Sequence, residues 1–329
     1  MISILMPVYN ARDSLPHALR SVRWQTFRDW QLVAADDGSV DGSRAVLREW
    51  ARSDPRIRVL ELPHRGLVET LNAGLAACEG RFVFRMDADD ICHPRRLERQ
   101  LAFLQPGHVV SCRIRMFPAA ALRCGFRRYE NWVNSLVLHE QIARDVFVES
   151  PLVHPTIGLE KELLEEVGGY RECGWPEDYD LWLRLWERGV LFTKAPEVLF
   201  YWRDHPARLT RTHERYEMAA LRRLKAHFLL RTYLRDSRPF AVWGAGRNGK
   251  RLARELARQG GRLAAFVDLH PRRIGERIDG IPVHHPDGFP DAPGTFHLAA
   301  VGREGGREDV REQLLSRGLV ELRDFVCVA

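Results

Sequence analysis

One short acidic stretch carries the residues whose types and spacing best suit chemistry on a ligand. Met86-Asp87-Ala88-Asp89-Asp90 places three carboxylates within four residues, directly after an apolar run. Residues two apart in an extended segment share a face, so Asp87 and Asp89 are predicted to point at one site. Crowded carboxylates repel one another unless a cation or water surrounds them. The stretch therefore indicates either a site for Mg²⁺ or Mn²⁺, which prefer oxygen ligands, or a solvated acidic loop.

Two other acidic stretches have a chemical and a structural interpretation each. Asp36-Asp37-Gly38-Ser39-Val40-Asp41-Gly42-Ser43 follows a predicted strand, where its carboxylates could accept hydrogen bonds from a base or a ribose. The same residue types also make ordinary turns. Glu177-Asp178-Tyr179-Asp180 opens a predicted helix, where a carboxylate can cap the helix or act as a general base toward a hydroxyl. Neither stretch alone distinguishes between its two interpretations.

A glycine motif near the C-terminus predicts a second ligand site. Gly244, Gly246 and Gly249 follow the GxGxxG pattern after an apolar run, and Asp268 lies 19 residues beyond Gly249. Glycines in this pattern let a phosphate approach the helix N-terminus, and an acid about 20 residues further on can bind a ribose. The motif is consistent with a bound nucleotide or with a purely structural role.

Alternating strand and helix signals over the first hundred residues would position the acidic stretches. Leu67, Leu71 and Leu75 recur at helical spacing, and Gly80 follows as a predicted C-cap. Strands that alternate with helices predict an α/β fold with a mainly parallel sheet, in which ligands bind beyond the carboxyl ends of the strands. The predicted strands of this part are 2–6, 31–35, 57–62 and 81–86. A further strand is predicted at 109–116, and later helices at 130–147, 161–167 and 177–188.

The pattern divides the chain into three parts. Residues 1–210 form the first domain, 211–237 a linking amphipathic helix, and 238–329 a small Rossmann-like α/β domain of nucleotide-binding type. The helix carries Leu221, Leu224 and Phe228 between arginines, so it could instead lie on an anionic membrane. The domain from 238 onward is about half the size of a full dinucleotide-binding fold.

Composition narrows the classes of partner. The net charge is +6, and four of the fifty cationic residues are lysine, so forty-six are arginine, whose side chain suits phosphate. Forty-four acidic residues are interspersed with them, which disfavours nucleic acid as a partner. No apolar run approaches the roughly 18 residues that span a bilayer, and a cytoplasmic protein is predicted.

Several segments taken in order resemble the family 2 glycosyltransferases, which are inverting enzymes with a GT-A fold that use sugar nucleotides. The resemblance extends over about residues 1–210. The matching segments are Ile4-Leu5-Met6-Pro7-Val8-Tyr9-Asn10, the DDGSVDGS run, Leu71-Asn72-Ala73-Gly74, MDADD, Gly168-Gly169-Tyr170-Arg171, EDYDLWLR and Tyr201-Trp202-Arg203-Asp204-His205.

The resemblance implies a role for individual residues. Asp178 would be the catalytic base, and Glu177 and Gly169 would lie on the acceptor side. Asp87, Asp89 and His205 would contact a divalent cation, either Mn²⁺ or Mg²⁺. His154 either faces the acceptor or has a structural role. The nucleotide sugar would be held by Pro7, Val8, Tyr9, Asp36, Arg65, Asn72, Asp87 and Ala88.

The resemblance also implies the reaction. A hexose would pass with inversion from a UDP-, GDP- or dTDP-linked donor to a glycan or lipid-linked acceptor, in the synthesis of a surface polysaccharide or glycolipid. Such an enzyme would be cytoplasmic, with peripheral contact at the inner face of the membrane. Two alternatives are an NAD-dependent oxidoreductase or sugar-nucleotide-modifying enzyme built on the GxGxxG domain, and a non-catalytic protein that binds nucleotide sugars.

Overall fold

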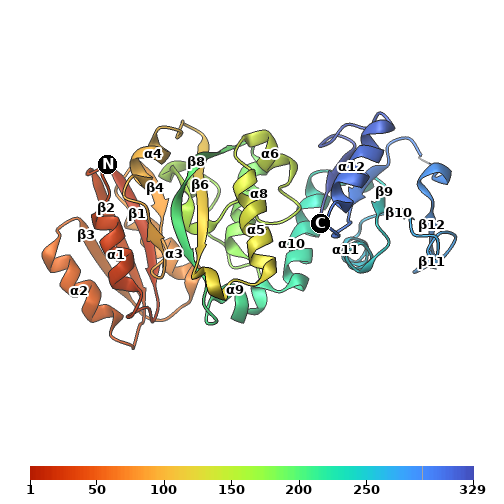
Figure 1. The fold of residues 1–329 in the computed structure, drawn as a ribbon. Coiled ribbons are helices and arrows are strands. Elements are labelled where there is room, and N and C mark those ends of the chain that lie inside the picture. The colour runs from red at the N-terminus through yellow and green to blue at the C-terminus, as the bar shows by residue number, and fades with distance from the viewer. Residues whose placement is uncertain (291) are drawn as a thin grey trace. The chain divides into compact units, whose positions relative to one another are not determined.

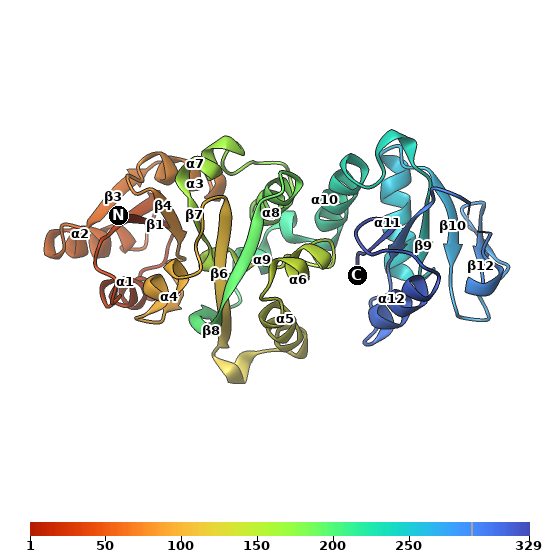
Figure 2. The same ribbon diagram turned by 90° about the horizontal axis from the view of Figure 1, so that it is seen from above.

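The computed structural model describes residues 1–290 and 292–329, which form two compact units (Figures 1 and 2). The first unit comprises 1–142, 152–173 and 177–212. The second comprises 143–151, 174–176 and 213–329. The second unit thus takes in two short segments from the middle of the chain as well as its C-terminal part.

A mixed sheet, parallel over its first four strands, forms the centre of the first unit. Its order is β3-β2-β1-β4-β7-β6-β8-β5, and β3, β2, β1 and β4 are mutually parallel. β7 is antiparallel to β4 and β6, β6 and β8 are parallel, and β5 is antiparallel to β8. The strands are β1 Ile2–Val8, β2 Trp30–Asp37, β3 Ile57–Leu62, β4 Phe82–Arg85, β5 Ile91–Cys92, β6 His108–Phe117, β7 Gly158–Glu160 and β8 Leu191–Arg203. The predicted α/β fold class is confirmed.

Helices flank this sheet and connect its strands (Figures 1 and 2). The helices are α1 Leu15–Arg23, α2 Ser43–Ser53, α3 Leu67–Ala76, α4 Arg96–Leu101, α5 Cys124–Ser135, α6 His139–Arg144, α7 Lys161–Glu166, α8 Glu177–Glu187 and α9 Leu209–Thr212, with 3₁₀ turns η1 Ala119–Ala121 and η2 His154–Thr156. The predicted single helix over 130–147 is wrong. Two helices occupy this region because the chain leaves helical geometry at Leu136, where φ is −85° and ψ is 100°.

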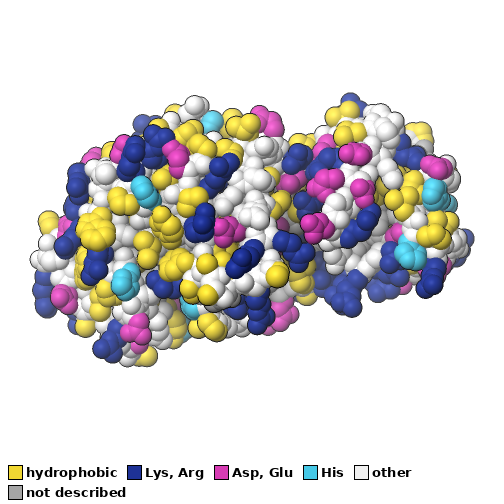
Figure 3. All heavy atoms as spheres, viewed as in Figure 1, with side chains coloured by type: hydrophobic (Ala, Val, Ile, Leu, Met, Phe, Trp, Pro, Cys, Tyr) yellow, Lys and Arg dark blue, Asp and Glu magenta, His cyan; other side chains and the backbone are white. Residues whose placement is uncertain are grey.

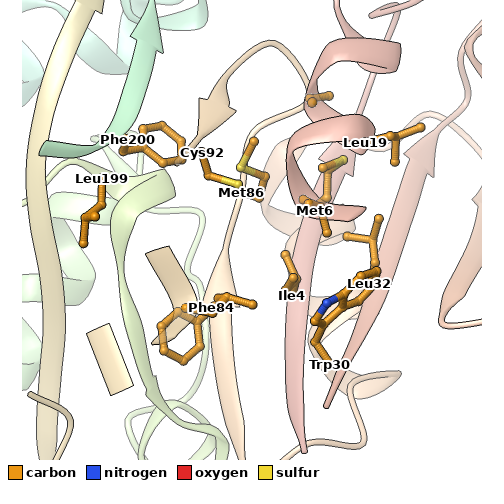
Figure 4. Packing of buried hydrophobic residues seen from close by; sticks show 14 of the residues in the cluster. Ile4, Met6, Leu19, Trp30, Leu32, Phe84, Met86, Cys92, Leu199 and Phe200 are labelled. Carbon is orange, nitrogen blue, oxygen red and sulfur yellow. The ribbon is translucent and has the colours of Figure 1, made fainter. Parts of the chain in front are cut away.

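The core of the first unit explains why its strands read as continuous apolar runs. β1 is buried along almost its whole length because helices cover both faces of a parallel sheet. Close packing is visible at Gly74 of α3, where an added Cβ would overlap with Leu5 of β1. Figure 4 shows members of the hydrophobic cluster that these elements share, among them Ile4, Met6, Leu19, Trp30, Leu32, Phe84, Met86, Cys92, Leu199 and Phe200.

The second unit contains a smaller sheet in the order β11-β12-β10-β9-β13-β14. All its pairings are parallel except β11 with β12. If the two-residue strand β11 is left out of the count, the five parallel strands from β12 to β14 stand in the order third, second, first, fourth and fifth along the chain. Dinucleotide-binding folds use this order. The elements are η3 Glu214–Tyr216, α10 Met218–Arg231, η4 Arg235–Ser237, β9 Phe240–Trp243, α11 Arg247–Arg258, β10 Leu263–Val267, β11 Arg277–Ile278, β12 Ile281–His284, η5 Pro286–Gly288, β13 Phe296–Ala299, α12 Gly306–Ser316 and β14 Phe325–Cys327.

The segment predicted as one linking helix, 211–237, is divided among the end of α9, η3, α10 and η4. Leu224 and Phe228 of α10 are fully buried within the protein, so these side chains are not presented to a membrane. Within the described residues, no helix combines the length and the apolar character needed to cross a bilayer. On the face in Figure 3, basic side chains are scattered among acidic and apolar ones.

Candidate functional site

The acidic stretches of the first unit follow the carboxyl ends of neighbouring strands. β2, β1 and β4 are adjacent and parallel, so Asp36, Tyr9 and Asp87 all lie at the same edge of the sheet. This edge is where ligands bind in open α/β sheets. The structure therefore brings together the segments that the sequence predicted for nucleotide and metal binding.

Asp36 has one carboxylate oxygen bonded and one without a protein partner. The side chain is completely buried at the end of β2. Its Oδ2 accepts hydrogen bonds from Arg44 Nε at 2.6 Å and from the Ser39 backbone N–H at 3.2 Å. Its Oδ1 is buried and has no hydrogen-bond partner among the described residues. A buried, unsatisfied carboxylate oxygen is costly, so this atom is suited to accept an N–H or O–H from a ligand.

Beside Asp36, an aromatic pair forms a flat surface at the edge of the sheet. Tyr9 is 49% exposed and stacks on His64, with ring centroids 4.3 Å apart and an interplanar angle of 16°. Asp37 Oδ2 lies 2.9 Å from His64 Nδ1. The Asp37 carboxylate also accepts hydrogen bonds from the backbone N–H groups of Arg65 at 2.8 Å and Gly66 at 3.0 Å. The side chain of Arg65 is exposed. The stacked rings provide a surface on which a planar base could lie.

Three aspartates after β4 form a compact set of oxygen ligands. One carboxylate oxygen from each of Asp87, Asp89 and Asp90 lies within 4.8 Å of the other two. Asp90 is buried; its Oδ1 accepts the Arg203 backbone N–H at 2.7 Å, and its Oδ2 has no partner among the described residues. Burial and the two neighbouring aspartates hold the pKa of Asp90 well above its ordinary value. A hard divalent cation fits this donor set, because it would satisfy the unpaired oxygen and neutralise the repulsion.

Asp90 was missing from the predicted ligands, although it is the third acid of the MDADD stretch. The predicted set consisted of Asp87, Asp89 and His205. His205 Nε2 lies 2.8 Å from Asp89 Oδ2, so the structure brings these two residues together. Ala88, between the acids, is buried. The signal that pointed to Asp90 was the density of carboxylates, but extended spacing placed it on the opposite face from Asp87 and Asp89.

Arginines at the end of β8 and in the segment after it contact or pack near the aspartates. Arg203 Nε donates to the Asp89 carbonyl oxygen at 2.6 Å. The Arg208 guanidinium packs over Trp202 at 3.9 Å, and its buried Nη1 has no hydrogen-bond partner among the described residues. Although burial opposes ionisation, the His205 hydrogen bond and the charge of Arg208 lower the pKa of Asp89. The cluster thus contains both oxygen ligands for a cation and a guanidinium suited to an anion.

Two adjacent carboxylates lie at the N-terminus of α8. Glu177 is 1% exposed and Asp178 is half-buried. Asp178 Oδ1 accepts the backbone N–H of Tyr179 at 2.7 Å. Burial and the neighbouring Glu177 charge raise the pKa of Asp178 to about 8. A carboxylate with such a pKa binds a proton strongly enough to act as a general base near neutral pH.

Asn72, predicted to help hold the nucleotide sugar, forms two hydrogen bonds with the protein backbone. Its Nδ2 donates to the Tyr170 carbonyl oxygen at 2.9 Å, and its Oδ1 accepts the Tyr170 N–H at 3.0 Å. Gly169 has a φ of 59°, and an added Cβ would lie 2.8 Å from Asn72 Oδ1. In this structure, Asn72 holds the loop that precedes α8.

His154 is a buried, neutral side chain behind the two carboxylates. It is 8% exposed, and burial together with the charge of Arg85 holds its pKa well below the ordinary value. Its Nε2 lies 3.3 Å from Arg85 Nε and 3.1 Å from the Tyr170 hydroxyl. These contacts fit the structural alternative for His154. No function was predicted for Arg85 from the sequence. An arginine within an apolar strand indicates a buried charge that needs partners, and this signal could have identified it.

The glycine motif of the second unit forms a strand–turn–helix, as its spacing predicted. Gly244 has a φ of 105°, and a Cβ at Gly249 would overlap with the Gly244 carbonyl oxygen. Asp268 lies after β10 and accepts the N–H groups of Ala245 at 2.7 Å and His270 at 2.8 Å. An ion pair with Arg273 at 2.9 Å completes its partners. Asp268 therefore ties the glycine turn to the next loop, a structural role that was one of the two expectations.

An added Cβ at Gly246 would make an ordinary van der Waals contact. The nearest heavy atom to an added Cβ is Arg273 Nη1 at 3.8 Å. Nucleotide binding at Gly244, Gly246 and Gly249 stays a prediction.

Solved structures share the fold of this chain. TarS residues 1–349 of S. aureus, in complex with UDP-GlcNAc, matches with a TM-score of 0.57 and 18% identity over 78% of this chain and 71% of that one. Against the longer TarS chain, the match covers 42% of TarS. The mannosyltransferase PcManGT of Pyrobaculum calidifontis, in complex with GDP-Man and Mn²⁺, matches with a TM-score of 0.52 and 21% identity over 70% and 61% of the two chains. The fold is therefore that of the GT-A class of glycosyltransferases.

The chain belongs to glycosyl transferase family 2, whose sequence profile matches residues 3–168, about half of the chain. A relative from Erwinia amylovora, the amylovoran biosynthesis glycosyltransferase AmsE, is 31% identical over 204 residues, which are 60% of this chain and 74% of AmsE. The Escherichia coli enzyme WfgD, named a UDP-Glc:alpha-D-GlcNAc-diphosphoundecaprenol beta-1,3-glucosyltransferase, is 34% identical over 110 residues, 33% of this chain and 43% of WfgD. The predicted family is confirmed.

Proposed function

We propose that this glycosyltransferase moves a hexose from a nucleotide-sugar donor to a hydroxyl of a glycan or lipid-linked acceptor, with inversion and with the help of a divalent cation. The names of the similar proteins AmsE and WfgD support a place in surface polysaccharide synthesis. The solved neighbours that bind UDP-GlcNAc or GDP-Man with Mn²⁺ support a nucleotide-sugar donor and a metal. A lipid-linked acceptor would bring the enzyme to the cytoplasmic face of a membrane.

One observation carries the proposal: at this edge of the sheet, two buried carboxylate oxygens have no hydrogen-bond partner among the described residues. These oxygens are Asp36 Oδ1 and Asp90 Oδ2, and Asp90 belongs to the compact set with Asp87 and Asp89. An N–H of a nucleobase would satisfy Asp36, and a cation bridging to a diphosphate would satisfy Asp90. A nucleoside diphosphate held with a divalent cation supplies both kinds of partner at once.

The residues of the site divide the reaction between leaving group and nucleophile. Asp87, Asp89 and Asp90 would hold the cation, which when bound stabilises the negative charge that develops on the departing diphosphate. Arg208, whose charge acts on Asp89 and Asp90, would share that charge. Asp178 would take the proton of the acceptor hydroxyl as that oxygen forms its bond to the anomeric carbon. Attack from the side opposite the leaving group gives inversion in a single displacement.

A ligand screen followed by one substitution tests the proposed function. The full chain is heated with UDP, GDP and dTDP and their sugar conjugates, each with Mn²⁺, Mg²⁺ or a chelator. We expect one nucleotide series to raise the melting temperature only with a metal, and the matching sugar donor to be consumed. Asp89→Asn should abolish both the stabilisation by metal and nucleotide and the consumption of the donor. Asp13→Asn, which changes an exposed aspartate outside the site, should preserve both. Metal-independent stabilisation, or full activity of Asp89→Asn, would contradict the proposal.

A further inference from the structure

A buried chain of contacts leads from the aspartates of the proposed metal site to the carboxylates at the start of α8. The reaction proposed above does not use these contacts. It starts at Arg85, the last residue of β4, which is 1% exposed. Arg85 Nη2 contacts Asp87 Oδ1 at 2.6 Å, and Nη1 donates to the Met86 carbonyl oxygen at 2.6 Å. Arg85 Nε donates to His154 Nε2 at 3.3 Å. The guanidinium thus contacts Asp87 and His154 through different nitrogen atoms.

His154 extends this chain toward α8. A neutral imidazole that accepts at Nε2 carries its proton on Nδ1. Nδ1 lies 3.9 Å from Glu177 Oε1, so the protonated nitrogen faces that carboxylate. Glu177 is 1% exposed and directly precedes Asp178. The order of contacts is therefore Asp87, Arg85, His154 and Glu177, all within the first unit.

One buried cation therefore serves carboxylates on two sides. The charge of Arg85 acts on both Asp87 and Glu177, and it also favours the ionised form of Asp178. The groups that face Asp178 are Glu177 on α8, Arg85 on β4 and the Tyr170 hydroxyl on the preceding loop. Charge interactions in a buried site are poorly screened, so a partner gained on one side of Arg85 alters the balance on the other.

From this arrangement we infer that Arg85 is a positioning residue that couples the donor site to the acceptor site. When Asp87 binds a divalent cation, its ion pair with Arg85 weakens, and the guanidinium charge is directed to Glu177 and Asp178. Donor binding would then favour the ionised base. This inference rests on the proposed function, because it takes Asp87 as a metal ligand and Asp178 as the base.

Thermodynamic reciprocity makes the coupling measurable without turnover. If a cation at Asp87 strengthens the interaction of Arg85 with Glu177, then the Glu177 charge must favour cation binding by the same factor. Glu177→Gln would leave Arg85 wholly to Asp87, where it competes with the metal. The substitution should therefore weaken metal–nucleotide binding, although Glu177 itself is not proposed to touch the metal.

A double-mutant cycle tests this coupling. Calorimetry on the full chain measures the dissociation constants of UDP and of GDP from the protein, each in the presence of Mn²⁺. We expect Glu177→Gln to raise the constant of the bound nucleotide about fivefold or more, the lower range of typical coupling. In an Arg85→Gln background, the same substitution should change it less than twofold. Arg85→Met provides a second route if Arg85→Gln does not fold, and in that background Glu177→Gln should likewise change the constant less than twofold.

A buried arginine outside the chain of contacts provides the control. Arg184 is 6% exposed and pairs with Asp180 on α8 at 2.6 Å. In an Arg184→Gln background, the full effect of Glu177→Gln should persist. If Glu177→Gln has equal effects with and without Arg85, the charge of Glu177 acts on the metal site directly. That result would overturn the coupling through Arg85 but not the proposed function. Failure of the wild-type chain to bind Mn²⁺ with any nucleotide would overturn the proposed function as well.

Discussion

At the scale of single residues, the aspartates of the site differ in how much of their bonding the protein supplies. Asp37 is satisfied by the backbone of the next loop, whereas Asp36 and Asp90 each keep a buried oxygen without a partner in the described part of the chain. Because such oxygens cost stability, residues that retain them are candidates for ligand contact. The bonding therefore separates structural from functional acids more clearly than the residue type does.

Asp178 should trade stability for activity. Its pKa of about 8 in the folded chain lies above its ordinary value of 3.8, so the folded state holds a proton that the unfolded state releases between these pH values. Stability therefore falls as the pH rises through this window. Asp178→Asn should melt a few degrees higher than the wild type at pH 9, with a smaller difference at pH 5, and should lose about 10²- to 10⁴-fold in turnover. Differential scanning calorimetry and initial rates check both results; an unchanged melting temperature at pH 9 would contradict the raised pKa.

The rate should also depend on pH through the same residue. The base acts only when ionised, so kcat/KM should increase with pH and level off above about 8. The Asp178→Asn enzyme should retain a small rate without this rise. A profile of donor consumption from pH 5.5 to 9.5 measures the effect, and a plateau already reached at pH 6 would refute the assignment.

At the scale of elements, the site depends on how loops attach to rigid strands and helices. The loop before α8 is held by the two hydrogen bonds between Asn72 of α3 and the backbone of Tyr170. Gly169 permits this attachment through its positive φ and its missing Cβ. The predicted acceptor-side position of Gly169 is thus accompanied by a packing requirement.

Gly169→Ala should destabilise the chain more than a glycine substitution in open space does. The new Cβ would meet Asn72 Oδ1 at 2.8 Å, and φ is 59°. Gly107 has a φ of 71° and no heavy atom within 4 Å of an added Cβ, so Gly107→Ala incurs backbone strain alone. We expect Gly169→Ala to cost about 1–2 kcal/mol more in the free energy of unfolding, measured by urea denaturation. Equal losses in the two variants would show that Asn72 yields easily.

At the scale of the whole molecule, the second unit is assembled from distant parts of the sequence. Lys225 of α10 is buried, and its Nζ donates to the carbonyl oxygens of Val148 at 2.7 Å and Val328 at 3.0 Å. Asp145 is likewise buried and pairs with Arg311 at 3.2 Å. Residues 143–151 and 174–176 belong to this unit and run directly into 152–156 and 177–178, which contain His154 and Asp178.

Lys225→Met should weaken the second unit measurably. The substitution keeps much of the side-chain volume but leaves two buried carbonyl oxygens without their donor. We expect a loss of roughly 1–3 kcal/mol in the free energy of unfolding, and faster hydrogen exchange in β14. Lys250→Met, on the less buried surface of α11, should change stability by less than about 0.5 kcal/mol. No difference between the two variants would argue against Lys225 as an internal tie.

Apolar runs and regular spacings in the sequence predicted the longer strands and helices. The strands β1 to β4 and the helix α3 follow from apolar runs and spacings of four residues, and the carboxyl-edge rule brought Asp36 and Asp87 to one edge. The two-residue strand β5 and the three-residue strand β7 have no period long enough to read. The partners of Asn72, Asp268 and Lys225 arise from tertiary contacts, which spacing along the chain does not reveal.

The position of a bound metal ion would show whether the three aspartates after β4 form a cation site. Crystals grown with Mn²⁺ and the nucleotide selected by the ligand screen would locate the ion by its anomalous scattering. We expect the peak between the carboxylates of Asp87, Asp89 and Asp90, with the nucleobase donating a hydrogen bond to Asp36 Oδ1. An ion bound elsewhere, or a nucleotide held only by the glycine turn of the second unit, would contradict it.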